Sequence, residues 1–264
     1  MLTILKDLWR YRNFVVSSIR AELLARFASS KLGGLWMIIE PLAQVAIYAL
    51  VLSNVLSARL PQVDSTYAYA IYLLSGLLAW TLFSEVIMRC LTLFIEQGNL
   101  MKKLNFPRIT LPGIAVGSCL LNNFLLLAAT LLVFALLGHS FSPIMLWVLP
   151  LTLCLVGLAV GLGMILGILN VFLRDIGKVV PILLQIGFWF TPIVYPESII
   201  PEEHRHLFDY NPMYPLVSAY HDVLLFQRLP DWHGLVWVLA LAVGCMLLAM
   251  FLFRRAGAEM VDVL

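Results

Sequence analysis

The chain has 264 residues, of which 62% are apolar and only 12% charged, and its mean hydropathy is +0.95. This composition excludes a soluble globular domain and is typical of a protein with several membrane spans. The formal net charge of +2 gives no sign of a nucleic-acid partner, and none is expected. The four cysteines lie far apart in or at the end of apolar runs, so we expect neither a disulfide framework nor a zinc site.

The first predicted element is a basic amphipathic helix over residues 3–31. Apolar residues such as Leu5, Trp9 and Ile19 recur at helical spacing, with Lys and Arg between them. A helix of this kind is too charged to span a bilayer, and it is expected to lie in the headgroup region. The segment lacks the compact apolar core of a cleavable signal peptide, so none is expected.

Six apolar runs follow, each of a length that can cross a bilayer. The predicted spans are residues 35–56, 67–88, 111–137, 144–171, 178–196 and 235–253. The sequence therefore predicts an all-α integral membrane protein, with six transmembrane helices in a single domain over residues 1–264. The fourth span holds two Gly-x-x-x-Gly pairs, Gly157/Gly161 and Gly163/Gly167, which predict close packing against neighbouring helices.

Residues 197–232 are rich in proline around two short apolar pieces. This pattern favours short re-entrant helices before the last span and a role as an exit gate. An ordinary loop outside the membrane is the alternative.

The distribution of positive charge predicts the orientation of the chain. Six spans place both ends of the chain on one side. Only Arg59, Arg205 and Arg228 of the 17 Lys and Arg residues fall in segments on the other side, and the remaining 14 lie on the side of the chain ends. Because positive charge is retained in the cytoplasm, both termini are expected to be cytoplasmic.

Two of the predicted spans carry a stripe of polar and aromatic residues at three- and four-residue steps, which places each stripe on one helix face. The first stripe is Trp36, Glu40, Gln44 and Tyr48, and the second is Lys178, Gln185, Phe188 and Tyr195. Polar groups at bilayer depth face protein or water rather than lipid. The stripes therefore predict either a polar passage or contacts between helices.

Several kinds of chemistry are missing from the sequence. It holds no phosphate-binding Gly-Lys-Ser or Gly-Lys-Thr loop, no Gly-x-Ser-x-Gly and no His-Glu-x-x-His. We therefore expect no enzyme activity, metal or cofactor in this chain. His204 and His206 are the nearest approach to a ligand pair, and a solvated loop is the favoured interpretation. Glu40 and Glu85 are the only acids within predicted spans, so proton-coupled transport would need one of them.

Four stretches in order along the chain resemble the membrane subunit of type-2 ABC exporters, in the branch that exports polysaccharides. They are LLARFASSKLGGLWMIIEPL (23–42), EQGNLMKKLNFPRITLP (96–112), LRDIGKVVPILLQIGFWFTPIVYP (173–196) and NPMYPLVSAYHDVLL (211–225). The third stretch includes the Arg174–Asp175 turn, which is expected to be cytoplasmic. His221 departs from the pattern, since members of this family often have arginine there.

The resemblance implies a homodimer that works with two copies of a separate cytoplasmic ABC ATPase, which would hold ATP and magnesium. It implies export of a lipid-linked glycan, such as the O-antigen of lipopolysaccharide, across the bacterial inner membrane. The basic loop between the second and third spans is the expected ATPase-docking site, with anionic lipid as its alternative partner. Its residues are Asn99, Leu100, Lys102, Lys103, Phe106, Pro107 and Arg108.

Other functions stay open at the level of sequence. A type-2 exporter could carry teichoic-acid-type polymers or a small drug. A transporter driven by an ion gradient is the alternative of a different class, but it would be expected to show repeat symmetry and paired acids in the membrane. A membrane-embedded glycosyltransferase would need carboxylates gathered near one face.

Overall fold

The computed structural model describes residues 10–27, 35–47, 68–98, 110–136, 138–197, 200, 203, 207–208, 210–256 and 259–260. Among these residues the chain is mostly helical and contains no β-strand. The all-α class predicted from the sequence is thereby confirmed for the described part of the chain.

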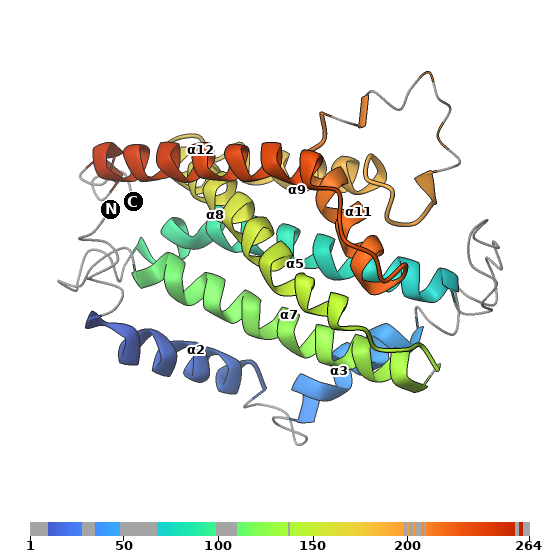
Figure 1. Ribbon diagram of the computed structural model, residues 1–264. Helices are drawn as coiled ribbons and strands as arrows, with labels where there is room; N and C mark the ends of the chain where they lie inside the picture. Colours follow the sequence, from blue (N-terminus) through green and yellow to red (C-terminus); the bar gives the residue numbers. More distant parts are fainter. Residues whose placement is uncertain are drawn as a thin grey trace.

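The helices follow one another along an elongated bundle (Figure 1). They are α2 (Arg12–Phe27), α3 (Trp36–Ile47), α5 (Ala68–Glu96), α7 (Thr110–Leu136), a 3₁₀ turn η3 (Pro143–Trp147) that runs into α8 (Val148–Phe172), α9 (Ile176–Trp189), α11 (Met213–Leu224) and α12 (Trp232–Ala256).

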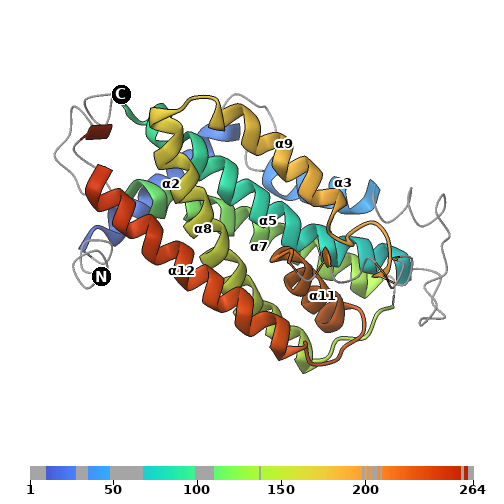
Figure 2. The ribbon, with the colours of Figure 1, turned by 90° about the horizontal axis from the view of Figure 1, so that it is seen from above.

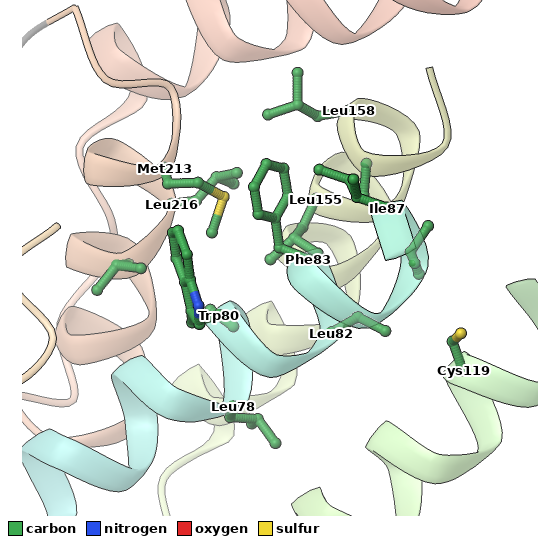
Figure 3. Packing of buried hydrophobic residues seen from close by; sticks show 14 of the residues in the cluster. Leu78, Trp80, Leu82, Phe83, Ile87, Cys119, Leu155, Leu158, Met213 and Leu216 are labelled. Carbon is green, nitrogen blue, oxygen red and sulfur yellow. The ribbon is translucent and has the colours of Figure 1, made fainter. Parts of the chain in front are cut away.

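Helix α5 is the core of the bundle and touches α7, α8, α9 and α11. It is predominantly apolar, and most of its residues are buried by these neighbours. Figure 3 shows Trp80 and Phe83 of α5 beside Met213 and Leu216 of α11. A helix with apolar side chains on most of its faces is one that other helices surround, and this accounts for the central place of α5.

Helix α8 lies between α5 and α12, and glycines bring the three backbones close together (Figure 2). A side chain at Gly163 or Gly167 would meet Cys90 of α5, whereas a Cβ atom on Gly161 would lie 2.7 Å from Cβ of Cys245 on α12. The close packing predicted for the two Gly-x-x-x-Gly pairs is confirmed. The first pair packs against α12 and the second against α5.

Four helices are long and apolar enough to cross a membrane: α5, α7, η3 with α8, and α12. Two shorter apolar helices, Ile38–Ile47 and Ile176–Trp189, coincide with the other two predicted spans. The structure therefore accounts for four of the six predicted spans by length.

Helix α9 is shorter than the predicted span over residues 178–196. Its 14 residues measure about 21 Å, against about 30 Å for a hydrocarbon core. Residues 190–195 form turns instead. Proline at position 192 lacks an N–H and disfavours helical geometry at Thr191, whose hydroxyl donates to the carbonyl of Gly187 at 2.8 Å.

The bundle has two distinct ends. Helix α5 ends, α7 begins and α12 ends at the left of Figure 1. We call this the basic end, because Arg174 and Lys178 follow α8 there and Arg254 and Arg255 close α12. Helix α11 lies at the other end, which we call the α11 end. These four basic residues gather at one end of the bundle, whereas Arg228 pairs with Asp222 of α11 at the other end.

Candidate functional site

Helix α9 exposes most of its surface within the subunit. Val180 is the one buried residue among its 14. Ile182, Ile186 and Trp189 are 58%, 50% and 59% exposed, and Gln185 is exposed between them. An uncovered face that joins large apolar side chains to an amide differs from a purely lipid-facing surface.

The second predicted stripe divides into two parts. Lys178 and Gln185 are exposed, as a lining role requires. Phe188 instead packs edge-on against Trp80 of α5, with ring centroids 5.8 Å apart. The hydroxyl of Tyr195 donates to the carbonyl of Trp189 at 2.7 Å. The stripe is therefore open toward the basic end and packed within the subunit toward the α11 end.

The first predicted stripe lies on α3 and beyond. Trp36 is 37% exposed, and Glu40 is also exposed. The side chain of Gln44 and the whole of Tyr48 lie outside the described residues. Helix α3 packs on α7, and Figure 2 shows α3 and α9 on the side of the subunit away from α12. In Figure 1, however, α9 lies at the edge of the bundle next to α12 and α3 at the opposite edge, so the two helices that carry the stripes are not neighbours within one subunit.

The turns after α9 are tied to α5 by two tyrosines. The hydroxyl of Tyr69 donates to the carbonyl of Val194 at 2.8 Å. The hydroxyl of Tyr72 lies 2.8 Å from the carbonyl oxygen of Pro192 and 3.0 Å from that of Tyr195. The tyrosines at the start of α5 therefore hold the turns at the end of α9.

The start of α11 holds the same turns from the other side. The side-chain amide of Asn211 donates to the carbonyl of Phe190 at 3.1 Å and to the hydroxyl of Thr191 at 2.9 Å. Its carbonyl oxygen accepts from the backbone N–H of Met213 at 3.0 Å, which fixes the first turn of α11. This helix has 12 residues and is too short to cross a bilayer.

His221 is a packing residue of α11 rather than part of an open outer site. It is 4% exposed and stacks on Tyr72 with ring centroids 3.8 Å apart. A Cβ atom on Gly76 would lie 2.9 Å from its Nε2 atom. Burial lowers the pKa of His221 below its ordinary value, so the imidazole is neutral. A larger arginine would not fit this space without movement of α5 or α11.

A polar cluster attaches α2 to the bundle. Glu22 forms an ion pair with Arg89 of α5, and its carboxylate accepts from the hydroxyl of Ser118 on α7 at 2.8 Å. One turn away, the amide of Asn122 donates to the carboxylate of Glu85 at 3.1 Å. Glu85, one of the two acids predicted within spans, therefore has a structural partner between α5 and α7.

Other predicted sites fall partly or wholly outside the described residues. These include the docking loop, Asn99, Leu100, Lys102, Lys103, Phe106, Pro107 and Arg108, and the histidines His204 and His206. Arg174 and Asp175 are described and exposed at the basic end. Within the described part of the chain, no three His, Cys, Asp or Glu side chains gather as a metal site.

Comparison with known proteins decides the family. The family model for the ABC-2 type transporter matches residues 14–225, which cover most of the chain. The chain belongs to the ABC-2 type transporter family. The family predicted from the four sequence stretches is thereby confirmed.

Named relatives of this ABC-2 protein are polysaccharide permeases. The chain is 29% identical to the O-antigen export system permease protein RfbA of Myxococcus xanthus, over 99% of both chains. It is 28% identical to the protein of the same name from Klebsiella pneumoniae, over 77% of each chain. The polysialic acid transport protein KpsM of Escherichia coli is 23% identical over 90% of this chain and 92% of its own.

Proposed function

We propose that this chain is the membrane-spanning subunit of an ATP-driven exporter of lipid-linked polysaccharide of the O-antigen type. The observation that carries the proposal is similarity to an O-antigen permease over 99% of both chains. The chain would act in the bacterial inner membrane as a six-span subunit with cytoplasmic termini, the amphipathic segment 3–31 lying along the inner face.

A separate ATPase supplies the energy in this proposal, because the sequence has no phosphate-binding loop. Residues 99–108 join α5 to α7 along the chain, and α5 ends and α7 begins at the basic end. Lys102, Lys103 and Arg108 would present charge to the ATPase, and Phe106 would anchor the contact. The exposed Arg174–Asp175 turn lies at the same end.

Two copies of the chain would form the glycan path. In a two-fold dimer each helix contributes twice, so α3 and α9 suffice to wall a passage. Both helices expose polar and aromatic side chains, Trp36 and Glu40 on α3 and Lys178, Gln185 and Trp189 on α9. Aromatic faces accept the C–H edges of sugars, and amides such as Gln185 bond their hydroxyls.

Helix α11 would serve as the exit gate. It lies opposite the basic end, and Asn211, just before its first turn, donates to the turns that follow α9. A gate placed there would open by release of these contacts while the bundle around α5 stays intact.

Deletion of the gene in its own host tests the function. The proposal predicts loss of surface polysaccharide, accumulation of the lipid-linked polymer inside the cell, and recovery of both from a plasmid copy. Unchanged surface polymer together with altered drug sensitivity would instead indicate a small-molecule exporter.

Charge reversal tests the docking loop separately. Lys102→Glu with Lys103→Glu is expected to reduce recovery of the ATPase on purification of this subunit, while the amount of the subunit in the membrane stays the same. Full recovery of the ATPase would contradict the docking role and favour contact with anionic lipid.

A further inference from the structure

Asn170 joins three helices through one buried side chain. It lies in the last turn of α8 and is 3% exposed. Its amide group donates to the carbonyl of Leu91 on α5 at 2.9 Å. Its side-chain oxygen accepts from the backbone N–H of Gly177 on α9 at 2.8 Å. Both functional groups of the amide are thus used, each toward a different helix.

The contact with Gly177 meets a need of α9. The first turn of a helix leaves its N–H groups without partners inside the helix, and the N-cap side chain commonly accepts from one of them. Asp175 is the N-cap residue of α9, yet its side chain makes no cap hydrogen bond within the described part of the chain. Asn170, seven residues upstream, supplies the missing acceptor.

The glycine at position 177 is required by the same contact. A Cβ atom there would lie 2.9 Å from the Oδ1 atom of Asn170. The close approach of α9 to α8 therefore depends on the absence of a side chain at this position. The hydrogen bond and the close packing of Gly177 against Asn170 describe one contact, which we call the joint.

This joint fixes the basic end of α9, a helix that is far less buried in the subunit than α5 is. Val180 is the only fully buried residue of α9, whereas Ile176, Leu184 and Phe188 are partly buried and pack against the core. Lys178, at the open part of the predicted stripe, directly follows Gly177. The amide of Asn170 thus adds directional hydrogen bonds to the apolar contacts of Ile176 and Val180, and it links the first turn of α9 to both α5 and α8.

We propose that Asn170 is the positioning residue for the entrance of the glycan path, because it holds the first turn of α9 against α5. This inference rests on the proposed function in one respect, the assignment of α9 to the path. The placement of α9 by Asn170 can be measured without any cargo.

The test uses Val180→Cys as a reporter, in a background without the four native cysteines. The complex with the ATPase is purified, and the rate of modification by N-ethylmaleimide is measured. Asn170→Ala is expected to raise this rate about ten-fold, since two hydrogen bonds within the membrane are lost. Gly177→Ala, which leaves Asn170 in place, is expected to raise it as well.

Asn123→Ala is the matched control. Asn123 is 6% exposed and donates to the carbonyl of Leu78 at 3.0 Å, so its loss removes a buried amide from the α5–α7 contact without touching α9. The modification rate of Val180→Cys should stay at the level of the parent. If Asn170→Ala is too unstable to purify, Asn170→Asp is used. It keeps the acceptor for Gly177 but cannot donate to Leu91, and a several-fold rise is expected.

Export of surface glycan at matched protein levels is the second readout. In the Asn170 variants the proposal predicts lower export together with faster modification of Val180→Cys. Asn123→Ala should show neither change. Equal modification rates in the Asn170 variants and the control would overturn the proposal. A raised modification rate with full export would support the placement of α9 by Asn170. It would overturn the role of Asn170 at the entrance and place the glycan path elsewhere.

Discussion

Helices α5 and α9 are neighbours with opposite relations to the rest of the subunit. Of the 29 residues of α5, 20 are buried, whereas α9 buries one of 14. Side chains along the whole of α5 touch other helices. Helix α9 is attached by a few apolar side chains, such as Val180 and Phe188, and by the hydrogen bond of Asn170 at its first turn. The comparison shows that α5 is the scaffold of the subunit, whereas α9 keeps an exposed surface, which is the surface that our proposal assigns to the cargo.

The contact of α5 with α8 is the most sensitive part of the scaffold. Gly167→Ala would place a Cβ atom against the carbonyl oxygen of Cys90, which belongs to a backbone that cannot move locally. The expected cost is about 2–3 kcal/mol of unfolding free energy. Thermal denaturation of the purified subunit measures it. Gly157→Ala, whose Cβ atom would lie 3.8 Å from that of Ala242, is the control and should be neutral. Equal stability of the two variants would break the distinction between scaffold and surface.

The link between α2 and α5 should have a smaller effect. Glu22 and Arg89 are about one-third exposed, so we expect Glu22→Arg or Arg89→Glu to cost about 1–2 kcal/mol, less than a fully buried pair. The double exchange should recover part of the loss, because the ion pair is restored in reverse. Denaturation of the four proteins in a double-mutant cycle measures the coupling. Additive losses would mean that the pair does not hold α2 to the bundle.

Loss of the contacts between Tyr72 and the turns after α9 should have the smallest effect on stability. Tyr72→Phe keeps the stacking on His221 but removes the hydroxyl that reaches Pro192 and Tyr195. The expected loss is about 1 kcal/mol of unfolding free energy. Labelling of single cysteines between Asn211 and Phe226 with a bulky aqueous reagent should increase in this variant, because Asn211 and Tyr72 hold the same turns after α9. Unchanged labelling would show that the tyrosine does not restrain the gate.

The long helices of the scaffold could be predicted from the sequence, because the features that produce them are local in the chain. Helices α5, α7, α8 and α12 follow from continuous apolar length, which the bilayer imposes on any chain that crosses it. The glycine pairs likewise predict close packing. Their partners Cys90 and Cys245 could not be predicted, since spacing along one helix does not identify its neighbour.

The candidate site is predicted less completely. A step of three or four residues places Lys178, Gln185, Phe188 and Tyr195 on one face, but does not say what covers that face. The structure leaves the first two exposed and packs the last two against α5 and the backbone after α9. Asn170 was missed, because its partner Leu91 is 79 residues away. A buried amide in an apolar run, seven residues before a glycine, is the signal that could have indicated it.

The most direct test of the account replaces Gln185 with tryptophan and measures surface glycan at matched levels of membrane protein. Gln185 lies on the exposed face of α9, so the bulky ring should block export while assembly with the ATPase and thermal stability stay close to those of the parent. Val236, 64% exposed on α12, is the matched control, and Val236→Trp should export normally. Full export by Gln185→Trp, or an equal loss in both variants, would contradict the assignment of α9 to the glycan path.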